Sequence, residues 1–283
     1  MDVHLVDGTY ELFRYHFSPA NKDPDRGATV GVVRSCLELV ARGATHVGVA
    51  CDHVIESFRN DLWPGYKTSA GMPRELLAQF PVVEDALRAA GFTVWPMVEV
   101  EADDAMASAA ALAAPDPRVG RVIICTPDKD LGQCVVEGKV WQWDRRQDKW
   151  FDVDGVRERL GVPPESVPDL LALIGDSADG FPGLPGWGAK SASAVLARWG
   201  HLEDIPADPI EWDAGVRGAS KLNLTLRQRW DDALLFRRIA TVERDCDVGQ
   251  VDEWEWNGPV DVSTVTDLCG ATVAKRASDL AAR

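Results

Sequence analysis

The chain has 283 residues, of which 46% are hydrophobic and 27% are charged, and its formal net charge is −15. This is the composition of a globular protein with a large core, organised as one domain with extensions or as two small domains. The acidic balance argues against a nucleic-acid partner unless the carboxylates are concentrated in one cation site, since net charge describes long-range fields and not a local site.

Secretion, membrane insertion and cysteine chemistry are not expected. A strand-like run at 3–6 follows the first Met almost at once, which leaves no room for a signal peptide, and no apolar run is long enough to cross a bilayer. The six cysteines form no CxxC pair and the five histidines show no metal-ligand spacing. We therefore expect buried free thiols in a cytoplasmic protein.

The first part of the chain alternates between expected strands and helices. Apolar runs at 3–6, 46–51, 92–95 and 119–126 predict buried strands. Helical spacing predicts helices over 28–42 and 73–90, with a break or new start at Pro81, while 57–67 is a connection without strong periodicity. Residues 140–143 and 149–152 are expected to form a short hairpin. This alternation predicts an α/β fold with a mainly parallel sheet flanked by helices.

An acidic stretch at 98–104 runs directly into the alanine-rich segment 105–110. Alanine favours a helix, and acids in the first turn suit the positive end of the helix dipole. Taken alone, the stretch is best interpreted as a solvated helix start. Glu99 matches no other acid and is expected at the surface.

Other acids follow the predicted strands in the same way, and ligands gather at the carboxyl ends of the strands in parallel sheets. Acids scattered over a surface would not all follow apolar strands, so we predict a metal site at this edge of the sheet. Its candidate ligands at or just beyond the strand ends are Asp7, Asp52, Glu101, Asp103, Asp104, Asp128 and Asp130.

From residue 153 the chain changes to helices with Gly- and Pro-rich connections. A buried helix at 170–174 ends in a segment that contains Asp176 and Asp179. The order Leu-Pro-Gly-x-Gly-x-Lys-Ser-Ala that follows is typical of a helix-hairpin-helix, in which glycines let backbone N–H groups approach a DNA phosphate. Its candidate contacts are Gly186, Gly188, Lys190 and Ser191. The alternative is a tight turn between helices without a ligand.

Residues 217–244 have a modest basic excess, for which a solvated helical face is nearly as good an explanation as a contact with duplex DNA. The tail contains a last helical pattern at 262–282. We expect it to pack on the body of the protein and assign it no chemistry.

Together these motifs resemble the 5′ nuclease family: flap endonucleases, phage 5′ exonucleases and the 5′–3′ exonuclease domain of bacterial DNA polymerase I. The resemblance covers residues 5 to about 240. Its seven ordered motifs are 6–9, Asp52 with 57–59, 66–67, 101–104, 126–130, 175–179 and 186–191. It implies a PIN-like α/β core at 1–160 with an arch or gateway at about 57–80, a helix-hairpin-helix region at 161–245, and a C-terminal extension at 246–283. No polymerase domain is expected, and the enzyme is expected to be a monomer.

The resemblance also implies a structure-specific nuclease that cuts DNA at 5′ flaps, nicks and 5′ ends in replication or repair and leaves a 5′-phosphate and a 3′-hydroxyl. Nine acids exceed the needs of one Mg²⁺ or Mn²⁺ and fit two ions roughly 4 Å apart. By resemblance, the first ion is held by Asp7, Asp52, Glu101, Asp103, Asp104 and Asp128, and the second by Asp130, Asp176 and Asp179. A monovalent cation is implied at the helix-hairpin-helix.

Four further residues are assigned by resemblance. Arg14 and Lys67 would contact the scissile phosphate, although each could be an ordinary surface residue. Tyr66 could stack on an unpaired base or pack within the arch. Arg59 is a candidate for a backbone contact.

The chain departs from the family pattern twice. Residues 68–71 offer no second basic residue after Lys67, and Gly180 stands where relatives have Asn. Two other functions remain open: a catalytically weak protein that recognises DNA structure, and a PIN-like ribonuclease. The complete acidic set argues against the first, and the hairpin with its basic helices argues against the second.

Overall fold

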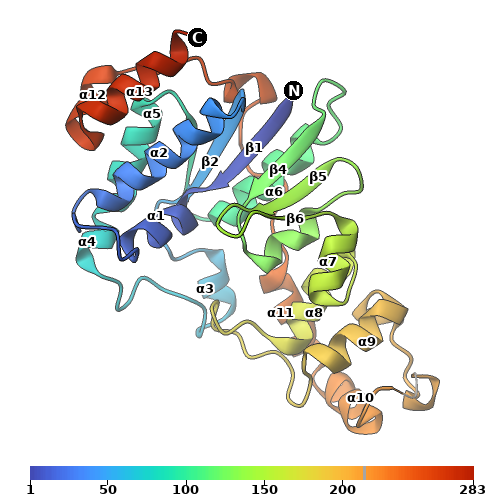
Figure 1. Cartoon of the computed structure of the whole chain (residues 1–283). Helices are drawn as coiled ribbons and strands as arrows, with labels where there is room; N and C mark the ends of the chain where they lie inside the picture. Colours follow the sequence, from blue (N-terminus) through green and yellow to red (C-terminus); the bar gives the residue numbers. More distant parts are fainter. Residues whose placement is uncertain (213–214) are drawn as a thin grey trace.

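The computed structural model describes residues 1–212 and 215–283. A sheet with the strand order β3-β2-β1-β4-β5-β6 forms the centre of the protein (Figure 1). Neighbouring strands are parallel except β5 and β6, which form the expected antiparallel hairpin. The mainly parallel α/β fold predicted from the sequence is therefore confirmed. The strands are β1 Asp2–Asp7, β2 His46–Asp52, β3 Thr93–Met97, β4 Arg121–Cys125, β5 Val140–Asp144 and β6 Lys149–Phe151.

Helices cover both faces of the sheet. On one face α1 Gly8–His16, α2 Gly27–Ala41 and α5 Gln79–Ala89 enclose a core with strand residues such as Val6 and Val49. On the other face α6 Ala102–Ala113 packs against Val3 and Leu5. The alternation of Val3, Leu5 and Val6 between the two cores is the expected period of a strand that is buried on both sides.

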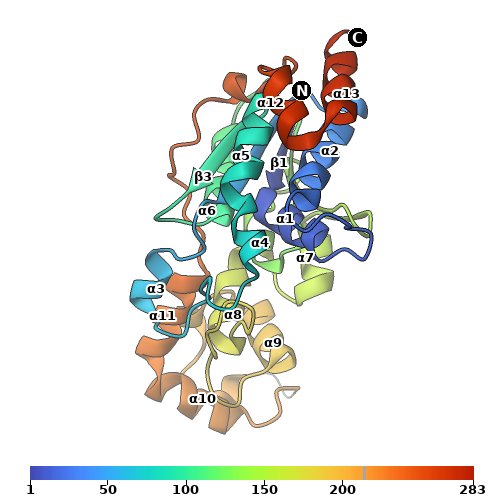
Figure 2. The same cartoon turned by 90° about the vertical axis from the view of Figure 1, so that its left-hand side faces the viewer.

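A smaller helical region lies beyond the carboxyl ends of the parallel strands (Figures 1 and 2). It has its own core, in which Leu171, Leu196 and Phe236 are buried. Its helices are α7 Val153–Leu160, α8 Val167–Ile174, α9 Ala189–Trp199, α10 Ala219–Gln228 and α11 Trp230–Ala240. Two short helices, α3 Phe58–Leu62 and α4 Arg74–Leu77, lie in the connection from β2 to α5.

After α11 the chain returns to the sheet. The 3₁₀ helix Val251–Trp254 buries Trp254 completely. The helices α12 Val262–Cys269 and α13 Ala271–Ala281 then pack on α5 and α2 (Figure 2). Within the described residues, no helix has the length and apolar character needed to cross a bilayer.

Several element boundaries differ from the sequence prediction. Asp7, the last residue of β1, also caps α1 by accepting a hydrogen bond from the Tyr10 N–H (2.7 Å), so no separate turn divides the strand from the helix. The helix expected over 73–90 is two helices, α4 and α5, with Pro81 in the first turn of α5, where its missing N–H is harmless. The connection over 57–67, for which the sequence showed no strong periodicity, contains the short helix α3. Gly270 divides the expected last helix in two.

Candidate metal centre

Carboxylates from three parallel strands converge at one edge of the sheet. Asp7 ends β1, Asp52 ends β2, and Asp128 follows β4. Glu101 caps α6 and Asp103 lies in its first turn. Together with Asp179 from the helical region, these side chains line one cavity of about 650 Å³, which we call the acidic cavity. Six of the nine acids predicted from the sequence are therefore brought to one place.

A second acidic group lies beside the acidic cavity. Carboxylate oxygens of Asp130, Asp176 and Asp179 lie within 4.8 Å of one another. Asp130 belongs to the 3₁₀ helix Lys129–Cys134 that follows β4, and the other two acids lie in the loop after α8. Because Asp179 belongs to both groups, the two groups are contiguous.

Hydrogen bonds within the described chain hold the acids in place. Asp7 accepts from the Thr126 hydroxyl (2.9 Å) as well as from its helix N–H, and Asp52 accepts from the Ala102 N–H (2.7 Å). Asp130 Oδ1 is buried and accepts no hydrogen bond from any described residue, although it lies 3.3 Å from Lys129 Nζ. A set of hard oxygen donors with an unsatisfied buried member fits Mg²⁺ or Mn²⁺.

The neighbouring carboxylates repel one another when they are ionised, and this repulsion adds to the effect of burial on their pKa values. Burial, followed by the neighbouring carboxylate of Asp52, raises the pKa of Asp7 to about 7. Burial and the charge of Glu101 raise the pKa of Asp52 to about 6, against the lowering effect of Lys67. Burial and nearby acids also raise the pKa of Asp103. The cluster therefore favours either protons or cations at neutral pH.

Two lysines partly balance this charge. Lys67 Nζ lies 2.7 Å from Glu101 Oε2 and 3.0 Å from Asp179 Oδ1, so it joins the sheet side of the site to the helical side. Burial opposes its charge, but these two carboxylates raise the pKa of Lys67 overall. Lys129 forms ion pairs with Asp176 and Asp130. The sequence interpretation gave Lys129 no role, although its position between Asp128 and Asp130 was the available signal.

Tyr66 does not offer a ring for base stacking. Its side chain is only 4% exposed and packs with the core of the helical region. Its hydroxyl donates a hydrogen bond to Glu101 Oε2 (3.2 Å). The stacking interpretation is therefore corrected: packing, with support for Glu101, describes the position of Tyr66.

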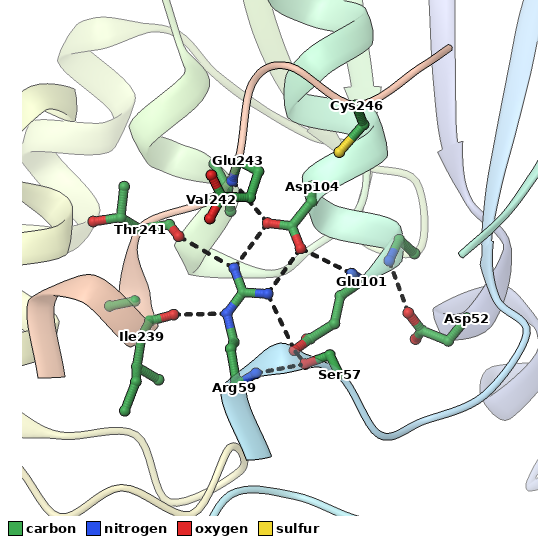
Figure 3. Close-up of polar contacts among 12 residues, drawn as sticks. Asp52, Ser57, Arg59, Glu101, Asp104, Ile239, Thr241, Val242, Glu243 and Cys246 are labelled. Carbon is green, nitrogen blue, oxygen red and sulfur yellow. Dashed lines mark hydrogen bonds and ion pairs between the residues drawn. The ribbon is translucent and has the colours of Figure 1, made fainter. Parts of the chain in front are cut away.

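Arg59 and Asp104 form a buried ion pair (Figure 3), and neither residue lines the acidic cavity. Arg59 is 3% exposed and Asp104 is fully buried, so neither can play the part expected from the sequence. The two guanidinium nitrogens Nη1 and Nη2 each lie 2.8 Å from a carboxylate oxygen of Asp104. Asp104 also accepts from the backbone N–H groups of Glu101 and Glu243, both at 2.8 Å. Arg59 is thus no surface contact for DNA, and Asp104 has no oxygen turned towards a metal.

The same guanidinium also connects three segments of the chain. It donates to the backbone carbonyls of Ile239 (2.8 Å) and Thr241 (3.2 Å), just at and after the end of α11. It reaches Glu101 Oε1 at 3.2 Å, while the Ser57 hydroxyl donates to the same oxygen at 2.7 Å. The start of α6 is therefore held both by α3 and by the end of the helical region.

Arg14 lies on another side of α1. Its Nη2 pairs with the buried carboxylate of Glu11 at 2.5 Å, and its guanidinium lies over the Tyr15 ring. It lines a different cavity from the one that the acids line. The expected contact with a phosphate in the acidic cavity is therefore not supported by its position.

The predicted hairpin joins α8 to α9. Gly186 has φ +86°, a left-handed conformation that suits glycine, and Gly188 caps α9. The Ser191 hydroxyl accepts from the Gly188 N–H at 3.2 Å. Gly186, Gly188 and Lys190 are exposed, so backbone and ammonium groups at this helix start are accessible to a ligand.

Gly180 has a physical reason to differ from the family's Asn. Its φ is +84°, and a Cβ at this position would lie 2.1 Å from the carbonyl oxygen of Gly65. The Gly180 carbonyl also accepts from Trp63 Nε1 (3.0 Å), while the Lys67 N–H donates to the Asp179 carbonyl (2.9 Å). The loop that carries Asp179 therefore packs backbone to backbone on the segment that carries Lys67.

Known protein families match both the sheet region and the helical region that form this site. Two family models match in succession: the 5′-3′ exonuclease N-terminal resolvase-like domain over residues 2–161, and the 5′-3′ exonuclease C-terminal SAM fold over residues 162–261. A 5′-3′ exonuclease of Aquifex aeolicus is 31% identical over 210 residues, which are 72% of this chain and 71% of that protein. A DNA polymerase I of Rhizobium leguminosarum is 30% identical over 98% of this chain, which spans 28% of that polymerase.

Solved structures have the same fold. The T5 5′-exonuclease with bound zinc aligns over 99% of this chain and 98% of its own, with a TM-score of 0.70 and 19% identity. The catalytic core of Rad2 in complex with a DNA substrate aligns over 99% of this chain and 92% of its own, with a TM-score of 0.63 and 15% identity.

Proposed function

Because the chain belongs to the 5′-3′ exonuclease family, as its motifs predicted, we propose that it is a metal-dependent, structure-specific nuclease acting on DNA at 5′ flaps, nicks and 5′ ends. Family membership makes it a nuclease of the 5′-3′ exonuclease and flap endonuclease type. The observation that carries the finer proposal is the convergence of six carboxylates on one cavity, with Lys67 bridging two of them.

Two divalent cations, Mg²⁺ or Mn²⁺, fit the acids better than one. The first would be held by Asp7, Asp52, Glu101, Asp103 and Asp128, and the second by Asp130, Asp176 and Asp179. Such ions would supply a water of lowered pKa for the attack on the phosphodiester and would offset charge on the phosphoryl oxygens. The unsatisfied buried oxygen of Asp130 and the solved relatives that contain metal ions support this assignment.

Lys67 is the residue of this chain best placed to meet the scissile phosphate. Its side chain is 29% exposed, lines the acidic cavity and belongs to the gateway segment at about 57–80. A protonated lysine there can pair with a phosphate oxygen and keep the reacting group next to the acids. Tyr66 and Ser57 keep Glu101 in place through their hydroxyl groups.

DNA would be held mainly by the helix-hairpin-helix, with a monovalent cation at its glycine turn. The exposed Gly186, Gly188 and Lys190 at the start of α9 support this, because such a helix start binds phosphates without reading bases. The proposal includes a core at 1–160, a DNA-binding region at 161–245 and an extension at 246–283. It extends to a monomeric, cytoplasmic enzyme of DNA replication or repair that leaves a 5′-phosphate and a 3′-hydroxyl.

The test is cleavage of a 5′-labelled flap duplex and of its RNA counterpart, each with Mg²⁺, Mn²⁺ or a chelator. We expect metal-dependent cutting of the DNA flap, and near-complete loss of cutting in Asp128→Asn with flap binding still measurable. Binding without cutting would favour the catalytically weak DNA-binding protein. Preferential cutting of the RNA would favour the ribonuclease.

A further inference from the structure

A second large cavity, of about 670 Å³, lies between α1, α2, β5 and α13, and we call it the arginine cavity. Its charged lining consists of Arg14, Arg34, Arg42, Arg145, Arg276 and a single acid, Glu38. On a chain with a net charge of −15, five guanidinium groups around one cavity form a concentrated positive field. Such a field favours an anionic ligand.

Several of these arginines are held in place by other residues. Arg14 is fixed by its ion pair with the buried Glu11. Arg145 Nη2 donates to the Ser35 carbonyl (2.9 Å), and its guanidinium lies 5.8 Å from the centre of the Trp143 ring. Arg276 pairs with Glu38 at 2.8 Å. The charges are therefore positioned before any ligand arrives, which lowers the entropic cost of binding.

Two guanidinium N–H groups remain without an acceptor. Arg14 Nε and Arg145 Nη1 are buried and donate to no group in residues 1–212 or 215–283. Buried donors are normally satisfied, so these two add unsatisfied hydrogen-bond donors to the arginines that line the cavity. Arginine's planar fork matches phosphate oxygens in particular, so the fitting ligand is a phosphate group.

The helix α1 is a wall shared by both cavities. Thr9, Tyr10 and Phe13 line the acidic cavity, whereas Arg14 and Tyr15 line the arginine cavity. A helix with its side chains is about 10–12 Å across, and a DNA strand advances about 3.4 Å per nucleotide. A strand that enters the acidic cavity can therefore reach the arginine cavity within about three or four nucleotides.

We propose that the arginine cavity binds a backbone phosphate of the same DNA whose scissile phosphodiester lies in the acidic cavity, and this inference rests on the proposed function. The site anchors the substrate on the far side of α1, independently of the helix-hairpin-helix. It also gives Arg14 a DNA contact at a place other than the reacting phosphate.

The experiment compares Arg34→Glu and Arg276→Glu with Lys275→Glu, a matched control that makes the same charge change beside Arg276 on α13 but outside the cavity lining. Binding of a flap duplex is measured by fluorescence anisotropy in EDTA over a series of salt concentrations. We expect each arginine variant to weaken binding several-fold and to reduce the slope of log K against log [salt] by about 1. The control should keep the wild-type slope. Equal behaviour of Arg276→Glu and Lys275→Glu would overturn the proposal.

A second arm separates DNA from a free phosphate compound. Inorganic phosphate and a deoxynucleoside monophosphate are titrated calorimetrically into the wild-type protein and Arg34→Glu. Tight binding of either compound that requires Arg34, with an unchanged duplex salt slope, would overturn the assignment to DNA. Wild-type flap cleavage is measured in parallel. If the wild-type protein cleaves the flap and the arginine variants bind the duplex as the wild type does, the DNA contact at the arginine cavity is refuted and the proposed function stands. If the wild-type protein does not cleave but the variants bind more weakly, the proposed nuclease function is refuted and the DNA contact stands.

Discussion

The buried ion pair between Arg59 and Asp104 allows a quantitative prediction for Arg59→Met. The substitution removes two hydrogen bonds of 2.8 Å to Asp104 and leaves that carboxylate without its countercharge inside the protein. It also leaves the carbonyls of Ile239 and Thr241 without their donor. Removing one partner of such a pair costs about 3–5 kcal/mol of unfolding free energy.

Denaturant unfolding of the wild type and the variant measures this loss. The matched control is Arg157→Met, because Arg157 pairs with Asp154 at 3.2 Å and the two side chains are 54% and 81% exposed. A pair at the surface contributes roughly 0–1 kcal/mol, so the control should be nearly neutral. The double variant Arg59→Met with Asp104→Leu should recover much of the loss, since it removes the unpaired charge. A loss below about 1 kcal/mol in Arg59→Met, or a double variant as unstable as the sum of the single variants, would refute the reasoning.

The same variant also tests whether Arg59 positions the proposed metal ligands. Asp104 caps the Glu101 N–H, so freeing its carboxylate should loosen the start of α6, which carries Glu101 and Asp103. We expect Arg59→Met to need more Mg²⁺ for half-maximal single-turnover cleavage, while its affinity for the flap duplex stays close to that of wild type. A purely structural role would lower the amount of folded enzyme without shifting the Mg²⁺ dependence.

Three further predictions follow from the site. Lys67→Ala should greatly lower the single-turnover cleavage rate while calorimetric metal binding persists, and an unchanged rate would remove Lys67 from the site. Without divalent cations, the melting temperature should fall as pH rises from about 4 to about 7. Burial raises the pKa of Asp7 to about 7 and that of Asp52 to about 6, so the folded protein binds more protons than the unfolded chain in this range. Mg²⁺ should flatten this dependence, and a melting temperature that rises from about pH 4 to about pH 7 would contradict the prediction. Gly180→Asn should lower stability measurably despite matching the family's usual residue, because its Cβ would lie 2.1 Å from the Gly65 carbonyl oxygen; wild-type stability in this variant would show that the loop moves freely.

The sheet and the acids at its edge could be predicted because both depend on local patterns. Apolar runs identify the strands, and the residue that ends a run must lie at the strand end, as Asp7 and Asp52 do. The exposed position of Glu99 also agrees with the prediction. In these cases the side chain's place follows from the backbone element that carries it.

The incorrect assignments have a different cause. Arg59 lies in the first turn of α3, but its carbonyl partners lie about 180 residues away at Ile239 and Thr241, which no local pattern reveals. For Arg14 the error is one of helix phase: successive helical residues point about 100° apart, so Phe13 lines the acidic cavity while Arg14 turns away from it. A family position identifies the residue type, but not the direction of the side chain.

At the proposed metal site, proton binding would compete with cation binding because the acids are buried. The pKa of Asp7 is raised to about 7 and that of Asp103 is also raised, so part of the cluster is protonated near neutrality. Carboxylates must lose their protons to coordinate a metal, so cation binding releases protons and weakens as pH falls. Lys67 and Lys129 provide the only charge compensation by lysine that the described residues give these acids. Each ammonium bridges two carboxylates, so under the proposed function a cation that satisfied those acids would free a lysine for a phosphate, and metal loading would be coupled to substrate binding.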